Sequence, residues 1–90
     1  MIISTITIKN KLGLHARASA KFVATTSQFL SKITVNKYNT ASINGKSIMA
    51  IIMLAAKQGD TLQLTIDGPD EEALEQAIIK LVNNLFGECE

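Results

Sequence analysis

The chain of 90 residues is long enough for one domain, spanning residues 1–90, with a single compact core. Its 47% apolar and 19% charged residues exclude a disordered chain, and no apolar stretch reaches the ~20 residues of a membrane-spanning helix. Residues 1–59 hold seven lysines and one arginine without an acid, whereas residues 60–90 hold eight acids and one lysine, so the halves carry +8 and −7. If the early segments share a face, that face attracts acidic partners such as phosphate groups.

The first elements follow from the spacing of apolar residues. Isoleucines alternate with threonines over residues 2–8 and predict a strand, after which residues 10–13 form a loop. A helix is predicted from Ala16 to about Gln28. We expect its apolar side to be formed by Ala16, Ala20, Val23 and Ala24.

A hairpin and a short helix are predicted next. Residues 33–36 and 40–43 alternate between apolar and polar side chains, which is typical of paired strands. Asn44 and Gly45 supply turn chemistry, and Ser47 lies where an N-cap residue is expected. The apolar segment 48–56 follows it and predicts a second helix.

The last third predicts a strand and the clearest amphipathic helix. Residues 61–66 alternate, and Gly68 and Pro69 end that strand. The helix begins at Pro69 or Asp70, with acidic residues in its first turn as the helix dipole favours. The element order βαββαβα therefore predicts an α+β open-faced sandwich, in which helices cover one face of an antiparallel or mixed sheet.

His15 and Arg17 are the candidate chemical groups, as the only histidine and the only arginine of the chain. They lie at the predicted start of a helix, where the backbone amides of Ala16, Arg17 and Ala18 form an anion site. A neutral imidazole there is a nucleophile, and the amides and a guanidinium can stabilise a phosphoryl group on the ring. The alternative is that His15 only caps the helix and Arg17 is a solvated side chain.

Other kinds of chemistry lack the residues they need. No cluster of ligands surrounds His15, so we expect no metal and no cofactor. A single cysteine, Cys89, cannot form an internal disulfide, and the N-terminal residues lack a secretory signal, so we expect a cytoplasmic protein.

The segment from Gly45 to Met49 is a second candidate site, because its predicted helix is apolar around most of its circumference. Some of these side chains must face outward, and exposed isoleucine and methionine suit docking. The alternative is a helix buried on several sides. We expect the docking surface to consist of Leu14, Ala20, Lys21, Ala24, Ile48, Met49, Ile51 and Ile52.

Two segments, Gly13 to Arg17 and Asn44 to Met49, resemble the two signatures of the HPr family of phosphocarrier proteins, and the resemblance covers essentially the whole chain. It implies a four-stranded antiparallel sheet with three helices on one face. It further implies that His15 accepts a phosphoryl group on its δ nitrogen from Enzyme I, that Arg17 steadies it, and that an EIIA protein receives it. Ser47 matches a serine that an HPr kinase/phosphorylase modifies in many relatives. We expect a monomer that binds neither nucleic acid nor membrane.

One position departs from the family pattern, since Ala18 follows Arg17 where relatives usually have proline. Alanine is a good helix former, so we expect the site to survive. A regulatory or nitrogen-branch relative, in which the phosphorelay controls enzymes or transcription, is the alternative within the family. An acylphosphatase-like hydrolase and a nucleic-acid-binding module are the alternatives outside it. Nucleic-acid binding is disfavoured, because Tyr38 is the one aromatic strand residue that could stack on bases.

Overall fold

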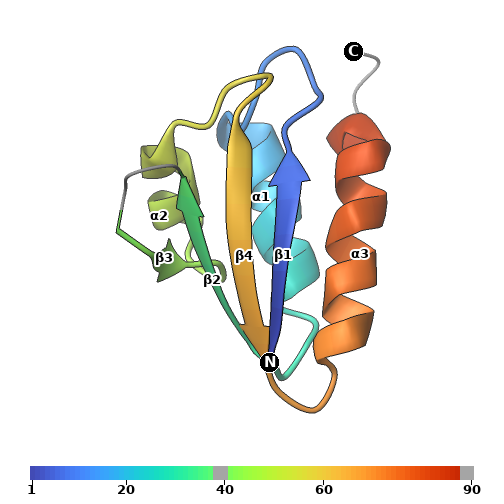
Figure 1. The fold of residues 1–90 in the computed structure, drawn as a ribbon. Coiled ribbons are helices and arrows are strands. Elements are labelled where there is room, and N and C mark those ends of the chain that lie inside the picture. The colour runs from blue at the N-terminus through green and yellow to red at the C-terminus, as the bar shows by residue number, and fades with distance from the viewer. Residues whose placement is uncertain (38–40, 88–90) are drawn as a thin grey trace.

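The computed structural model describes residues 1–37 and 41–87, which form one sheet covered by helices on one face (Figure 1). The elements in chain order are β1 (Ile2–Thr7), α1 (Ala16–Thr26), β2 (Lys32–Lys37), β3 (Ile43–Asn44), α2 (Ile48–Leu54), β4 (Thr61–Asp67) and α3 (Glu71–Asn83), followed by a 3₁₀ turn at Leu85–Gly87. The strands lie in the order β1-β4-β2-β3, and all neighbours are antiparallel. The predicted α+β open-faced sandwich is therefore confirmed. In the described part of the chain, no helix has the length and apolar character to cross a bilayer.

The core lies between the inner face of the sheet and the helices. Leu64 of the central strand β4 pairs in register with Val35 of β2, and both side chains are fully buried. Because side chains alternate along a strand, the threonines and Gln63 of β4 face away from the helices. Phe22 from α1 and Ile78 from α3 close the core from the other side, also without exposed area.

The inner side of α1 differs from the prediction. Its buried residues are Ala18, Ser19, Phe22 and Thr26. The predicted apolar side is wrong because Ala16, Ala20 and Ala24 are exposed, and only Val23 packs against the core. Two hydroxyl groups can be buried here since each donates a hydrogen bond to a backbone carbonyl, from Ser19 to Leu14 at 3.0 Å and from Thr26 to Gly45 at 2.8 Å.

The predicted hairpin is only partly described. Val35 of β2 pairs with Ile43 of β3, but β3 contains two residues, and Ala41 and Ser42 are not in a strand. Residues 38–40, which include Tyr38, lie outside the described residues, as does Cys89.

A network around Asp70 joins the start of α3 to the turn after α1. Its carboxylate accepts hydrogen bonds from the backbone amides of Leu30 and Ser31, each at 2.9 Å, and from the Ser31 hydroxyl. In return the Asp70 amide donates to that hydroxyl oxygen at 3.2 Å. The hydrogen bond from the Ser31 hydroxyl and those from the Leu30 and Ser31 amides lower the pKa of Asp70.

This network predicts a loss of stability in acid. A carboxyl group whose pKa is lower in the folded chain stabilises the fold above its unfolded-state pKa, and this contribution is lost as the pH falls through the folded-state value. We expect the free energy of unfolding in urea to fall more for the native chain than for Asp70→Asn between about pH 6 and about pH 3. Glu71, whose pKa is lowered by the N-terminal ammonium group, contributes to both proteins alike. Equal losses in the two proteins would contradict the prediction.

Candidate functional site

His15 is the N-cap residue of α1. Its backbone is extended, with φ −74° and ψ −178°, and its carbonyl accepts the first intrahelical hydrogen bond from the Ser19 amide at 2.8 Å. Its Nδ1 accepts a hydrogen bond from the backbone N–H of Arg17 at 3.2 Å. Since a backbone N–H can only donate, Nδ1 carries a lone pair in this arrangement. The helix is thus capped by a ring nitrogen of a half-buried imidazole.

The first turn of α1 provides backbone hydrogen-bond donors at this end of the helix. The amides of Ala16, Arg17 and Ala18 have no intrahelical acceptor, because the first such bond is made by Ser19. They lie at the positive end of the helix dipole, which favours an anion at this place. The Arg17 side chain is exposed. A phosphoryl-sized anion on Nδ1 would therefore lie at the N-terminal end of α1, where the Arg17 amide already donates to this nitrogen.

The loop before His15 packs closely against the segment that follows α2. Gly13 has φ +68°, and a Cβ atom there would overlap the carbonyl oxygen of Ala56 and lie 2.9 Å from the Cα of Lys57. That same carbonyl accepts the Leu14 amide at 2.9 Å. Gly13 is therefore required both for its left-handed backbone and for the close approach of two chain segments.

Alanine at Gly13 is expected to lower the free energy of unfolding by about 2–4 kcal/mol, from left-handed strain and from overlap with Ala56. Gly59 is a matched control, since it also has a positive φ (+91°) but no atom within 4 Å of a Cβ. We expect Gly59→Ala to lose only the strain contribution of about 1–2 kcal/mol. Urea unfolding of both variants measures the difference, and equal losses would show that the contact with Ala56 contributes nothing.

Ser47 is the N-cap residue of α2, as its place in the sequence predicts. Its Oγ accepts a hydrogen bond from the Ala50 amide at 3.4 Å, and its carbonyl accepts one from the Ile51 amide at 3.0 Å. The side chain is half-buried. Lys46 beside it is anchored, because its ammonium group donates to the Phe29 carbonyl at 2.6 Å. A hydroxyl group thus lies at the start of α2, next to α1, against which α2 packs.

The predicted docking residues divide by exposure. Leu14 and Ile51 are buried, at 3% and 0% exposure, because both belong to the core, so their prediction as surface residues is wrong. Ala20, Ala24, Ile48 and Met49 are exposed and Ile52 is half-buried. Met53, at 77% exposure, was missed although it lies in the same apolar helix. A docking role for the exposed residues stays a prediction.

Lys21, the remaining predicted docking residue, is half-buried and holds the 3₁₀ turn after α3. Its ammonium group donates a hydrogen bond to the Phe86 carbonyl at 2.7 Å. Leu85 and Phe86 both have positive φ, and the Phe86 side chain is fully buried. The Lys21 side chain therefore joins α1 to the end of the described chain, and docking by Lys21 stays a prediction.

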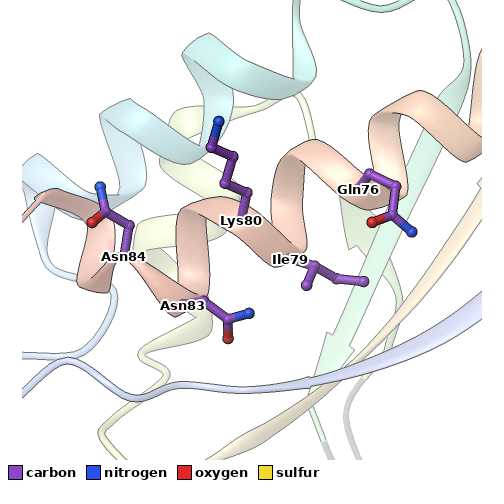
Figure 2. Close-up of a pocket in the computed structure, with 5 residues that line it drawn as sticks. All are labelled: Gln76, Ile79, Lys80, Asn83 and Asn84. Carbon is purple, nitrogen blue, oxygen red and sulfur yellow. The ribbon is translucent and has the colours of Figure 1, made fainter.

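A depression on the outer side of α3 has no residues of either candidate site. It is lined by Gln76, Ile79, Lys80, Asn83 and Asn84. Figure 2 shows that its polar side chains do not converge, since Lys80 points away from Asn83. Among residues 1–37 and 41–87, no three histidine, cysteine, aspartate or glutamate side chains gather to hold a metal ion.

Two hydrogen bonds that hold the loop before His15 were not predicted from the sequence. Asn10 is fully buried and donates to the Gly13 carbonyl, and a local signal existed, since asparagine first and glycine fourth is a preferred pattern of type I turns. The contact of Leu14 with Ala56 has no local signal, because it joins segments 42 residues apart (56 less 14).

Comparisons with known proteins point to one family. Residues 2–84 match the family model described as the PTS HPr component phosphorylation site. The phosphocarrier protein HPr of Neisseria meningitidis serogroup A is 51% identical over 90 residues, which is the whole of both chains. The crystal structure of HPr-C-His from Thermoanaerobacter tengcongensis has a TM-score of 0.92 at 48% identity and 98% coverage of each chain. A structure described as an HPr dimer from that organism has a TM-score of 0.76 at 46% identity, with 98% of this chain and 100% of that chain covered.

Proposed function

The chain belongs to the HPr family of phosphocarrier proteins of the phosphotransferase system, and we propose that it accepts a phosphoryl group from phosphorylated Enzyme I on Nδ1 of His15. It then passes the group to an EIIA protein or domain. The observation that carries the proposal is the hydrogen bond from the Arg17 amide to Nδ1. It supports the proposal because a nitrogen lone pair then lies at a helix N-terminus, and helix N-termini favour anions.

In the acceptance step, the Nδ1 lone pair forms a bond to phosphorus while the bond from phosphorus to the donor breaks and leaves its electron pair on the donor. No general base has to remove a proton from Nδ1, because that nitrogen is already an acceptor. The Arg17 amide loses its acceptor when Nδ1 bonds to phosphorus. A phosphoryl oxygen can take its place, so the same donors serve the helix before transfer and the anion after it.

Transfer from His15 to an EIIA protein requires that the phosphoryl group is stabilised on the ring but not so strongly that it cannot leave. The amides of Ala16, Arg17 and Ala18 supply directed donors, whereas the Arg17 guanidinium is exposed. Solvent weakens an exposed charge pair, so the guanidinium steadies the group only moderately. All the donors proposed to stabilise the phosphoryl group on His15 belong to one chain, so the proposal needs only one copy of it.

Ser47 is the proposed regulatory site. A phosphate on its Oγ would lie at the N-terminus of α2 and would be stabilised there. It would also add negative charge next to the exposed Ile48 and Met49, which we assign to the docking surface. Modification by an HPr kinase would thus leave the fold intact and hinder the approach of Enzyme I.

Incubation of the chain with Enzyme I and labelled phosphoenolpyruvate tests the proposal. We expect label to enter the chain in an acid-labile form and to leave it when an EIIA protein is added. A chain that takes up no label, or that releases it only as inorganic phosphate, would contradict the carrier role and favour a hydrolase.

A further inference from the structure

Asn10 is the only residue among those at 1–37 and 41–87 whose side-chain amide is fully buried. Its Nδ2 donates a hydrogen bond of 2.8 Å to the Gly13 carbonyl, and the Gly13 amide donates one of 3.2 Å back to the Asn10 carbonyl. A single residue therefore closes the turn from residue 10 to residue 13 twice, once with its side chain and once with its backbone. Asn10 belongs to neither of the two segments that resemble the family signatures.

The peptide groups between this turn and His15 are held as well. The Leu14 amide donates to the Ala56 carbonyl at 2.9 Å, and the Leu14 carbonyl accepts from the Ser19 hydroxyl at 3.0 Å. The Leu14 side chain is in the core. With the Gly13 carbonyl bound by Asn10, both polar groups of the Gly13–Leu14 peptide bond and the carbonyl of the Leu14–His15 peptide bond are hydrogen-bonded.

We propose that Asn10 is a positioning residue for phosphoryl acceptance, acting through Gly13 and Leu14 to hold His15 Nδ1 against the Arg17 amide. The inference rests on the proposed function of His15. Transfer requires the nitrogen and the phosphorus to meet in line, and a misplacement of about 1 Å can slow such a step about 100-fold. Without the Asn10 amide, the Gly13 carbonyl is left in the interior without this donor, so the turn must move to satisfy it.

Asn10→Asp and Asn10→Ala test the inference in the full chain. The first keeps the size of the side chain but removes its N–H donor, and the second removes the donor without burying a charge. We expect kcat for acceptance from Enzyme I to fall about 10- to 100-fold at an unchanged KM, since the docking surface is not altered. If the aspartate variant does not fold, the kcat and KM of the alanine variant test the inference.

Ser31→Ala is the matched control, because it also removes buried side-chain hydrogen bonds, but at the turn that contacts Asp70. We expect it to lose stability and to keep both kinetic constants within about twofold. A kcat that falls equally in the control and in the Asn10 variants would show a general effect of stability and overturn the inference.

A measurement without any partner separates this inference from the proposed function. The 15N chemical shift of His15 Nδ1, recorded where the ring is neutral, reports the hydrogen bond from the Arg17 amide. We expect that shift to change in the folded Asn10 variant and to stay the same in Ser31→Ala. If the native chain takes no phosphoryl group, the proposed function fails, whereas the chemical shift still decides whether Asn10 positions the His15 ring. A folded Asn10 variant with an unchanged shift would overturn it.

Discussion

Replacing His15 by alanine is expected to abolish acid-labile labelling of the chain by Enzyme I and phosphoenolpyruvate. No other imidazole exists in the sequence, so no side chain can take over the nitrogen nucleophile. The fold should persist, because a half-buried cap residue is lost at a cost of about 1 kcal/mol. Label uptake and urea unfolding measured on the same preparation give both results.

His15→Asn is the matched control for the capping role. Asparagine is among the best N-cap residues, and its side-chain oxygen can accept the hydrogen bond of the first turn in place of Nδ1. We expect this variant to be at least as stable as His15→Ala and equally unable to accept the phosphoryl group. Label on either variant would show that the acceptor lies elsewhere in the chain.

Ser47→Asp is expected to slow phosphoryl acceptance by about 10- to 100-fold, because a negative charge at a docking surface meets a partner that brings a negatively charged phosphoryl group. The helix itself should not suffer, since aspartate is a good N-cap residue and lies at the positive end of the α2 dipole. Steady-state kinetics with Enzyme I should show the change mainly in KM. The substitution adds the charge without the bulk of a phosphate.

Ser47→Asn separates charge from shape. It keeps a capping oxygen at the start of α2 and adds no charge, so we expect a rate within about twofold of the native chain. If the asparagine and aspartate variants are slowed equally, the charge is not the cause, and the regulatory role of Ser47 in this account is wrong.

The starts of α1 and α2 could be predicted because they depend on local patterns. Ser47 precedes an apolar segment and is confirmed as the N-cap of α2, and the predicted helix start at Ala16 is confirmed as well. His15 caps α1, a role that the sequence offered only as the alternative to phosphoryl acceptance. Strand alternation similarly predicts the inner face of β4, where Leu62, Leu64 and Ile66 are buried. Period and capping act within a few residues, so the sequence alone displays them.

The contacts that hold the site are less visible in the sequence. The predicted apolar side of α1 is wrong because three of its alanines are exposed. Phe22 and two residues with hydroxyl groups enter the core instead. A buried hydroxyl group is acceptable only where a distant carbonyl receives its hydrogen, as Gly45 does for Thr26. The prediction that Leu14 and Ile51 lie on the surface is wrong for a related reason. Only the packed chain shows which apolar side chains enter the core.

NMR spectroscopy of the phosphorylated native chain, with 15N in the imidazole ring, shows which nitrogen holds the phosphoryl group. We expect a coupling between phosphorus and Nδ1 of His15, together with a changed environment of the Arg17 amide as its acceptor becomes a phosphoryl oxygen. Phosphorus bonded to Nε2, or to any residue other than His15, would contradict the proposed acceptance on Nδ1.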